Sequence, residues 1–501
     1  MAAVEKSEVK EPTYGNWRKP QTAGLGRLSL GTSLLLMGGL VVVVIAMLIA
    51  FWVAVGLAVV LALALLPTTV SDRHGRTLMS RMATRLAWRR TVKNGSHIYR
   101  SGPLGRTGHG TCTLPGLAAA STLIEARDSY DRPFAMLTYP STNSHVVVLS
   151  CEADGASLVD QNQIDTWVAH WGDWLAKLAH EPGLTGASVT VETAPDSGIR
   201  LHTEVESNIS DRAPDLARAM LTEVLADYPA GSAQITTRIA LTYSGAARPG
   251  QERRTADQMA VMLGNRLPSL TSGLKWTGAG AARPMTAVEL CEAVRVAYDP
   301  AVSTLIERAR AEGGSNLEWH DAGPASAEES WSHYRHDSGY SVTWQMSQAP
   351  RGEVLSSVLT GLLAPDRDID RKRVTLLYRP HTAGEAARIV ERDRKDALFR
   401  AQQSKHATAR NDVEVRAAEQ TAREEAGGAG VTRFALVVTA TVLGREKLPR
   451  AQAAIENLAP QARLLVRPVE GSQAAAFASA LPLGLVLHKH LAVPSVVRDN
   501  L

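Results

Sequence analysis

The pattern of apolar and polar residues divides the chain at once, because positions 28–66 contain no charged residue. A core helix needs only one apolar face, whereas a bilayer span needs about 20 consecutive apolar residues. One straight helix over this run would measure roughly 58 Å at about 1.5 Å per residue, far more than a hydrocarbon core of about 30 Å. The run therefore predicts a two-helix transmembrane hairpin over 28–70 with its turn near 47–52. Gly38 and Gly39 would let the two helices approach closely.

Basic residues flank both ends of this apolar run. Arg18, Lys19 and Arg27 precede it, and an arginine-rich segment follows it. Because basic residues favour the cytoplasmic side of a membrane, we expect both flanks in the cytoplasm, as two spans require. A signal peptide fits poorly, since its apolar region is only about 7–15 residues long. We therefore predict a multi-pass protein of the cell (inner) membrane with both termini cytoplasmic. The candidate membrane-interface residues are Trp17, Arg27, Phe51 and Trp52.

The segment that follows the hairpin is strongly basic. Positions 73–106 carry nine Lys or Arg residues and no acid, and positions 76–93 are expected to form an amphipathic helix on the membrane. Anionic headgroups attract such residues by about 1 kcal/mol per charge, which makes membrane lipids the expected partner. Direct contact with DNA phosphates or with an acidic protein is the alternative. The candidate basic residues are Arg73, Arg76, Arg81, Arg85, Arg89, Arg90 and Lys93.

Alternating apolar positions beyond residue 133 indicate a first α/β domain. The expected elements are a strand at 145–151, a helix at 161–180, strands at 187–193 and 200–207, a helix at 214–227 and a strand at 233–243. Their order, β-α-β-β-α-β, is the ferredoxin-like order. Three further helices between 256 and 312 are expected to form a helical linker region.

A second alternation starts at position 340. Strands are expected at 340–348, 373–378, 433–442 and 462–467, and helices at 352–363, 446–458 and 473–481. A highly charged helical stretch at 383–426 interrupts them, and its removal leaves the ferredoxin-like order again. Such a charged helix is usually solvated and would also suit a helical partner in an assembly.

The predicted architecture is an α+β membrane protein in which the transmembrane hairpin precedes two tandem ferredoxin-like (βαββαβ) cytosolic domains. Its expected divisions are an N-terminal cytosolic segment (1–27), the hairpin (28–70), a basic juxtamembrane segment and linker (71–132), a first α/β domain (133–245), a helical linker region (246–338) and a second α/β domain (339–501) that contains the insertion 383–426.

Composition narrows the functional classes further. The formal net charge of the 501 residues is only +4, so the chain as a whole lacks the basic signature of a nucleic-acid-binding protein. Its three cysteines, Cys112, Cys151 and Cys291, are scattered and odd in number. They argue against a disulfide framework and agree with a reducing compartment.

Motifs that carry chemistry do not occur in the sequence. It contains neither a GxxxxGK[ST] phosphate loop nor a GxSxG nucleophile elbow. The best metal-like cluster has side chains of kinds that can bind zinc or iron, and it comprises His320, Asp321, His333, His336 and Asp337. Arg335 lies inside this cluster and would repel a cation, so we interpret the cluster as structural. We therefore predict a non-enzymatic protein with no catalytic residue, no metal and no cofactor.

Several short segments spread along the chain form a recognisable set. They are Tyr14-Gly-Asn-Trp-Arg-Lys-Pro, Tyr99-Arg-Ser-Gly-Pro-Leu-Gly, Leu158-Val-Asp-Gln, Trp167-Val-Ala-His-Trp-Gly, Val191-Glu-Thr-Ala-Pro-Asp-Ser-Gly, Lys372-Arg-Val-Thr-Leu-Leu-Tyr-Arg-Pro and Gly471-Ser-Gln-Ala-Ala-Ala-Phe. Together they resemble an actinobacterial membrane-protein family encoded with conjugative, type IV secretion-like elements. The resemblance spans nearly the whole chain.

A wider similarity gives this resemblance a function. The hairpin with its basic flank resembles the membrane-hairpin subunit of type IV secretion systems, which in some systems is fused to the traffic ATPase. The later part, up to Ala480-Leu-Pro-Leu-Gly, is similar to the end of the non-catalytic N-terminal half of that ATPase. The P-loop motor does not follow, so ATP hydrolysis is not implied. The resemblance implies an inner-membrane scaffold in an oligomeric complex, docking a separate traffic ATPase and other membrane subunits.

Two alternatives stay open. A membrane component of an actinobacterial type VII secretion system can also pair two spans with a cytosolic α/β domain. The other alternative is a membrane-anchored enzyme that acts on a lipid or nucleotide, which would need a pocket lined by converging acids or histidines.

Overall fold

One antiparallel sheet of 13 strands organises the protein, which is an α+β protein. The computed structural model describes residues 12–15, 17, 30–70, 72–105, 110–153, 155, 159–210, 212–227, 233–247, 252–350, 352–403 and 409–491. The strands are β1 (Ile98–Arg100), β2 (Thr122–Arg127), β3 (Pro133–Tyr139), β4 (Ser144–Glu152), β5 (Leu184–Pro195), β6 (Ala233–Ser244), β7 (Ala281–Pro284), β8 (Ser326–Glu329), β9 (Tyr334–His336), β10 (Gly339–Gln348), β11 (Arg371–Pro380), β12 (Thr432–Val442) and β13 (Leu465–Pro468). Their order along the sheet is β1-β8-β9-β10-β12-β11-β5-β6-β4-β3-β2, with β13 paired to β10 and β7 to β4.

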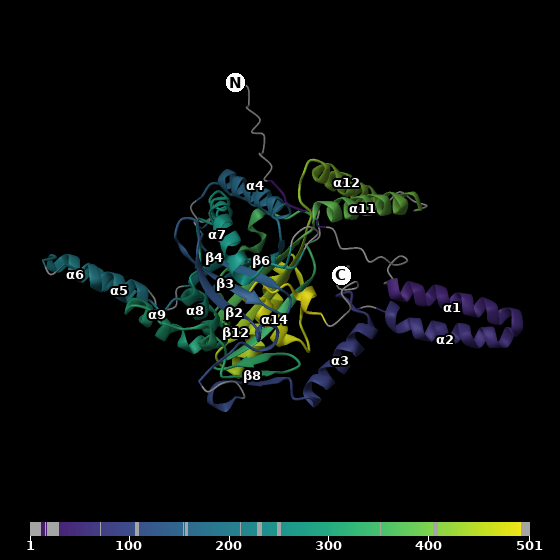
Figure 1. Cartoon of the computed structure of the whole chain (residues 1–501), viewed down its shortest axis with the longest axis horizontal. Helices are drawn as coiled ribbons and strands as arrows, with labels where there is room; N and C mark the ends of the chain where they lie inside the picture. Colours follow the sequence, from purple (N-terminus) through teal and green to yellow (C-terminus); the bar gives the residue numbers. More distant parts are fainter. Residues whose placement is uncertain are drawn as a thin grey trace, which may run out of the picture.

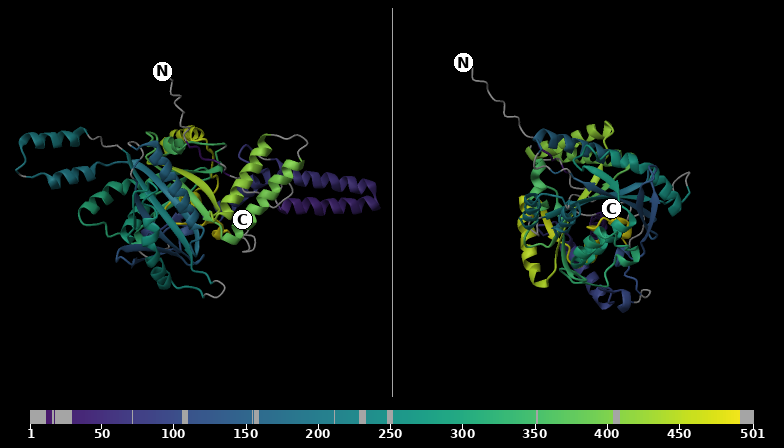
Figure 2. Two further views of the ribbon diagram at one scale, coloured as in Figure 1. Left: turned by 90° about the horizontal axis from the view of Figure 1, so that it is seen from above. Right: turned by 90° about the vertical axis from the view of Figure 1, so that its left-hand side faces the viewer.

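Helices cover this sheet and extend beyond it. Those of the described residues are α1 (Leu30–Ile49), α2 (Phe51–Thr69), α3 (Leu78–Lys93), α4 (Gln161–Leu178), α5 (Ile199–Asn208), α6 (Asp215–Asp227), α7 (Ala256–Ser272), α8 (Ala287–Tyr298), α9 (Ser303–Ala311), α10 (Thr360–Leu363), α11 (Ala383–Gln403), α12 (Ala409–Ala426), α13 (Leu448–Gln461) and α14 (Gln473–Ser479). Figure 1 shows the pair α1–α2 extending from one end of the body and the pair α5–α6 from the opposite end. The view from above in Figure 2 shows the same separation.

The N-terminal half of the sheet, β2 to β7, has a regular strand order. β4, α4, β5, β6, α7 and β7 follow one another along the chain, and their antiparallel pairings place the strands in the order β7-β4-β6-β5. Between β5 and β6 the chain inserts α5 and α6. The structure thus places β7 in the sheet of this half and packs α7 on one of its faces, although both lie in the expected linker region.

The C-terminal half, β8 to β13, repeats this arrangement. β10, α10, β11, β12, α13 and β13 follow one another, and the strands lie in the order β13-β10-β12-β11. Here the chain inserts α11 and α12 between β11 and β12. Both halves therefore share one strand order, and both carry a helical pair between their second and third strands.

The two halves are joined edge to edge by these second strands. β5 pairs with β11 in antiparallel register, with Val191 opposite Val374 and Thr190 opposite Thr375. Ladder hydrogen bonds satisfy the backbone groups of both edges, which would otherwise be exposed. The sheet is therefore continuous across the junction.

Separate apolar clusters lie on the faces of the sheet. α4 and α7 bury Trp174 and Leu263 on one face of the N-terminal half. On its other face, Leu290 of α8 packs in one cluster with Phe477 of α14. In the C-terminal half, Ile455 of α13 packs in the cluster that contains the β10 and β12 side chains. This enclosure explains why the central strands read as apolar runs.

The chain after α13 crosses from one half to the other. Thr375 of the C-terminal half donates a hydrogen bond from Oγ1 to the carbonyl of Ala480 at 2.9 Å. Thr242 of the N-terminal half donates likewise to the carbonyl of Gly484 at 2.6 Å. α14 and the residues after it thus add a second tie between the halves.

The strand expected at 200–207 is wrong, because these residues form the helix α5. Asp196 Oδ1 accepts a hydrogen bond from the backbone N–H of Gly198 at 3.0 Å, and Gly198 has φ 72°. This turn directs the chain away from β5. Without a neighbouring strand, a helix is the conformation that satisfies the backbone groups internally.

Two other expected helices also differ. The stretch 383–426 forms two helices, α11 and α12, linked by an ion pair between Arg400 and Glu414 at 3.5 Å. The helix expected at 352–363 is reduced to a 3-10 turn at Ser356–Leu359 followed by the single turn α10. Gly361 lies within that short helix, where glycine weakens helical propensity.

Candidate membrane interface

α1 and α2 form a helical hairpin outside the sheet body, with Ala50 between them. α1 has 20 residues and α2 has 19, and each measures about 30 Å at 1.5 Å per residue. The helices lie close together at Gly39, where an added Cβ would clash with a methyl carbon of Leu61. At Gly38 an added Cβ would meet nothing within 4 Å. The structure breaks the helix at Ala50, within the range expected for the turn, and brings the two helices close together at Gly39, whereas Gly38 faces outward. That the pair forms a transmembrane hairpin stays a prediction.

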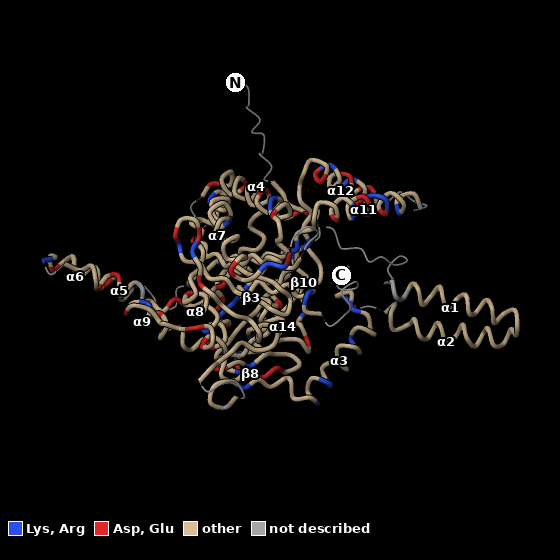
Figure 3. The backbone as a smooth tube through the Cα atoms, in the orientation of Figure 1, with Lys and Arg blue, Asp and Glu red and all other residues tan. Residues whose placement is uncertain are grey.

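The side chains of this hairpin are largely exposed and entirely uncharged. Leu48, Ile49 and Trp52 expose 85%, 82% and 81% of their surface. Figure 3 shows no Lys, Arg, Asp or Glu along either helix. Removing apolar surface from water contributes about 25 cal/mol per Å², so an apolar surface of this extent favours an apolar surrounding.

One segment of the described chain, Phe51–Thr68, is both long and apolar enough to cross a membrane. Ser33–Ile49 forms a shorter apolar helix. By length and composition, the described residues thus contain one helix that could cross a membrane. A second span needs the packing of the hairpin as an additional argument.

The four candidate interface residues lie in different places. Phe51 and Trp52 stand together at the turn of the hairpin, with ring centroids 5.6 Å apart. Trp17 instead packs against Phe434 at the start of β12, at 6.4 Å between centroids. Arg27 lies outside the described residues. The structure therefore brings two of the four together and places Trp17 on the body.

A tight turn connects the hairpin to α3. Asp72 Oδ1 accepts hydrogen bonds from the backbone N–H groups of His74 and Arg76, both at 2.9 Å. The bond from Arg76 is the largest cause that lowers the pKa of Asp72 below its ordinary value. Thr77 Oγ1 then caps α3 by accepting from the N–H of Ser80 at 3.2 Å.

One face of α3 docks on the body. The Trp88 ring lies 6.1 Å from the ring of Trp331. Arg76, just before the helix, pairs with Glu470 at 3.9 Å and is half-buried. The sequence placed Arg76 among the residues facing the membrane, but the structure directs it to the body.

The other face of α3 is open to solvent, and no residue of the helix is buried. Arg73 precedes it and is exposed, with Nε hydrogen-bonded to His74 Nε2 at 3.0 Å. The large exposed apolar side chains are Leu78, Met79, Met82, Leu86 and Val92. The exposed basic side chains of the helix are Arg81, Arg85, Arg89, Arg90 and Lys93.

One residue of the metal-like cluster, His336, lies in the core instead. His336 is buried, with Nδ1 2.6 Å from the carbonyl oxygen of Tyr298 and Nε2 2.7 Å from Ser341 Oγ. Burial is the main cause that lowers the pKa of His336 to about 4. Asp337 accepts a hydrogen bond from the N–H of Ser326 at 3.0 Å. Within the described residues, no group of three or more His, Cys, Asp or Glu could hold a metal ion.

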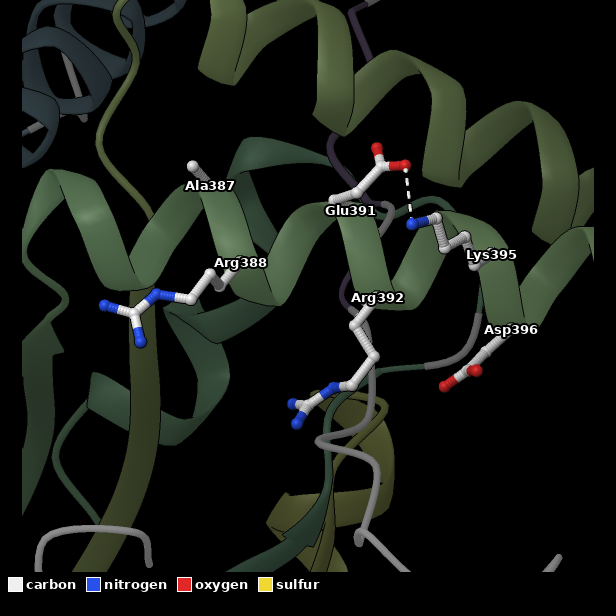
Figure 4. A pocket seen from close by; sticks show the side chains of 6 residues that line it. All are labelled: Ala387, Arg388, Glu391, Arg392, Lys395 and Asp396. Carbon is white, nitrogen blue, oxygen red and sulfur yellow. Dashed lines mark ion pairs between the residues drawn. The ribbon is translucent and has the colours of Figure 1, made fainter.

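Two hollows on the described surface are open to solvent, and no histidine lines either of them. One runs along α11, where Arg388 and Arg392 project beside the ion pair of Glu391 and Lys395, as Figure 4 shows. Another lies against Trp167 and neighbouring side chains on α4. Neither has the converging acids and histidines that an enzyme site of the kind considered above would need.

An ionic cluster at the junction of the two halves was missed by the sequence reasoning. Glu192 on β5 accepts hydrogen bonds from Arg371 at 2.9 Å, Arg373 at 3.2 Å and Arg238 at 3.1 Å. Burial by itself would raise the pKa of Glu192, but the three arginines outweigh it and hold that pKa well below its ordinary value. The only sequence signal was a pair of arginines at alternate positions in a strand.

Comparison with known families gives one match, at the hairpin. The model of a domain of unknown function (DUF8461) matches residues 21–80, which contain α1, α2 and the first residues of α3. No curated protein matches the chain. The match thus covers the candidate membrane interface, and the sheet lies outside it.

Proposed function

We propose that this protein is a structural component of a cell-membrane assembly, anchored by α1–α2 as two spans with the body and both termini in the cytoplasm. The observation that carries the proposal is the exposed, uncharged hairpin that stands outside the sheet next to the basic helix α3. Two spans are favoured over one because α1 packs along α2 at Gly39. If α2 alone entered the bilayer, the exposed leucines and valines of α1 would stay in water.

The body of this assembly component consists, in our proposal, of two tandem ferredoxin-like domains. The orders β7-β4-β6-β5 and β13-β10-β12-β11 support this assignment, since each places the first strand between the fourth and the third. The helical pairs α5–α6 and α11–α12 are then insertions at one equivalent position. The proposed role is binding and geometry rather than bond breaking.

The assembly we propose is a conjugative, type IV secretion-like apparatus in which the body docks a separate traffic ATPase. The resemblance of the quoted segments supports this choice, and the structure adds a candidate docking face. Leu216, Met220 and Val224 form an exposed apolar stripe along α6, at the end opposite the hairpin. A stripe at this spacing suits an apolar groove of a partner protein.

Membrane extraction followed by affinity purification tests both parts of the proposal. We expect the full chain to resist alkaline carbonate, to need detergent, and to bring a P-loop secretion ATPase with it. Tags at both termini should be protected from protease added to intact cells. Recovery without detergent would contradict the anchor. Recovery from membranes without a secretion ATPase, or with type VII subunits instead, would contradict the assembly.

A matched pair of variants isolates the hairpin. Val59 in α2 and Val224 in α6 are similarly exposed, at 52% and 50%. Val59→Arg places a charge at the centre of a proposed span, which costs about 2.5–3.5 kcal/mol on insertion scales, so membrane retention should fall. Val224→Arg should leave retention unchanged. Equal retention of the two variants would contradict a membrane-embedded α2.

A further inference from the structure

We infer that α3 is a second membrane-binding element, whose outer face takes anionic phospholipid headgroups while its inner face fixes the body against the bilayer. The inference deepens the proposed function and rests on it, since the hairpin is what brings α3 to the membrane surface. It also decides between the two ligands, lipid and DNA, that the sequence left open for this basic segment.

The outer face of α3 combines apolar and basic rows. Leu78, Met82 and Leu86 follow one another at four-residue spacing and are 38%, 67% and 52% exposed. Arg81, Arg85 and Arg89 form a neighbouring row at the same spacing, because residues four apart share a helix face. Figure 3 shows the basic positions along α3. A helix with this composition suits the boundary between headgroups and acyl chains.

The inner face of α3 is held by the body, which fixes the direction of the outer face. Trp88 packs near Trp331, and Arg76 pairs with Glu470. The side chain of His74 adds a contact between Nδ1 and Ser347 Oγ at 3.3 Å. Because these contacts lie before and along the helix, α3 cannot rotate freely about its axis. The apolar and basic rows must therefore point away from the sheet.

The place of α3 in the chain puts its apolar residues nearest the bilayer. The N–H of Leu78 donates to the carbonyl of Val70, just beyond α2, at 3.1 Å. The first turn of α3 is thus fixed against the end of the hairpin. Four of the five large exposed apolar side chains of α3 lie between 78 and 86, close to this junction, and the fifth is Val92. The basic positions continue to Lys93.

This combination favours lipid over DNA. Phosphate contacts with DNA need cations and hydrogen-bond donors, and they would leave Met79, Met82 and Leu86 exposed to water. A bilayer surface satisfies both rows, because its headgroups take the cations and its upper acyl region takes the apolar side chains. α11 provides the contrast: its exposed Lys395 is paired with Glu391 at 3.5 Å, and the hollow between its cations contains no large apolar side chain.

The test measures phosphatidylglycerol binding to the full chain. Purified protein in a neutral detergent is titrated with phosphatidylglycerol or with phosphatidylcholine, and bound lipids are counted by native mass spectrometry. The first variant carries Arg85→Gln, Arg89→Gln and Arg90→Gln. Its control carries Arg388→Gln, Arg392→Gln and Lys395→Gln, which removes the same charge from α11.

We expect the α3 variant to bind phosphatidylglycerol about one-hundredfold more weakly, since each charge at an anionic surface is worth about fivefold. Binding of phosphatidylcholine should not change, and the α11 control should behave as the wild type. Wild-type affinity in the α3 variant would overturn the inference. These positions are exposed, and circular dichroism verifies that each variant is folded.

A second variant separates lipid from DNA. Met79→Ser with Met82→Ser removes apolar side chains and no charge, so phosphatidylglycerol binding in equimolar phosphatidylcholine–phosphatidylglycerol nanodiscs should weaken. A fluorescent DNA duplex is titrated in parallel with the same proteins. If the arginine variant lost duplex binding while its lipid binding stayed intact, DNA would be the ligand and the inference would be overturned.

Failure of this inference and failure of the anchor give different results. A chain that resists carbonate but binds phosphatidylglycerol equally well in all variants keeps its anchor and loses the role of α3. A chain that carbonate extracts, yet whose lipid binding falls with the α3 arginines, loses the anchor and keeps a lipid-binding helix.

Discussion

The two halves of the sheet share one strand order but treat their inserted helices differently. In the C-terminal half, α11 and α12 bury Val390 and Ala418 and are joined by an ion pair. In the N-terminal half, α6 leaves Leu216, Met220 and Val224 exposed. The same position in the same scaffold therefore carries a helical pair with buried apolar residues in one half and a helix with a row of three exposed apolar residues in the other.

This difference shows which features the scaffold determines. Strand order depends on ladder pairing and on the apolar clusters, so it is kept in both halves. The insertions leave the sheet after its second strand, so their outer surfaces are free to serve a partner. Substitutions at the junction of the halves, within one half and in the two insertions test this difference.

The largest expected effect is at the junction. Glu192→Gln removes the carboxylate that pairs with Arg238, Arg371 and Arg373. Leaving buried charges uncompensated costs about 3–5 kcal/mol, so the free energy of unfolding should fall by that amount. Urea titration in detergent, followed by circular dichroism and by tryptophan fluorescence, measures the change and shows whether both halves unfold together.

Glu289 supplies the control for this prediction. It pairs with Arg283 at 2.7 Å on a partly exposed surface of the N-terminal half. Exposed pairs contribute about 0–1 kcal/mol, so Glu289→Gln should have a small effect. Similar losses in the two variants would mean that the cluster does not stabilise the junction more than a surface ion pair does.

The next effect, of about 2 kcal/mol, concerns the C-terminal half and depends on pH. The pKa of His336 is lowered from 6.5 to about 4 in the folded protein. Between these values the unfolded chain binds the extra proton, so this contribution to stability is complete above pH 6.5 and is lost as the pH falls toward 4. Between about pH 7 and about pH 5 the free energy of unfolding should fall by about 2 kcal/mol from this group.

A variant without this histidine isolates the contribution. His336→Asn should be less stable at neutral pH, because a buried ring and its two hydrogen bonds are lost. Between about pH 7 and about pH 5, its free energy of unfolding should fall by about 2 kcal/mol less than that of the wild type. An unchanged pH slope in the variant would assign the acid sensitivity to other groups.

Much of the fold could be predicted from local patterns, and the misses have physical causes. β12 was expected at 433–442 and occupies Thr432–Val442, because its apolar residues lie in one long run. The expected strand at 200–207 is wrong although Leu201, Thr203 and Val205 alternate as in a strand. These residues form a helix because no strand of the described chain lies beside them. β7 has only four residues and too short a pattern to detect.

Replacing one valine by alanine in each insertion should have a smaller effect on stability. Val390→Ala in α11 removes buried surface, since this valine is 4% exposed. At about 0.8 kcal/mol per buried methylene, the loss should be about 1.5 kcal/mol. Val224→Ala in α6, which is 50% exposed, should stay within about 0.5 kcal/mol of wild type. Denaturant midpoints of the two variants decide this, and equal losses would show that α6 packs in solution as α11 does.

The candidate interface was only partly predictable, for a related reason. Composition alone located the hairpin and the basic helix. The partner of Arg76 is Glu470, from a distant part of the chain, so no local pattern could show that this arginine turns to the body. The cluster at Glu192 combines residues of three strands, β5, β6 and β11. These ion pairs depend on how the strands align with one another in the sheet. A single sequence does not give that alignment.

The smallest effect on stability is expected where the effect on assembly should be largest. Leu216→Ser with Met220→Ser changes two side chains that are 73% and 59% exposed. Exposed substitutions of this kind shift stability by less than about 0.5 kcal/mol, so the variant should fold, insert and bind phosphatidylglycerol as the wild type does.

Co-purification from detergent-solubilised membranes then reports on the partner alone. Loss of the secretion ATPase from this variant, with retention by a Phe399→Ser variant of α11, would assign docking to α6. Phe399 makes a matched control because it is a large apolar residue of the other insertion and is 58% exposed. Retention of the partner by the α6 variant would remove this face from the proposed interface. The apolar stripe of α6 would then be ordinary solvent-exposed surface, because an exposed stripe takes part in assembly only if a partner protein covers it.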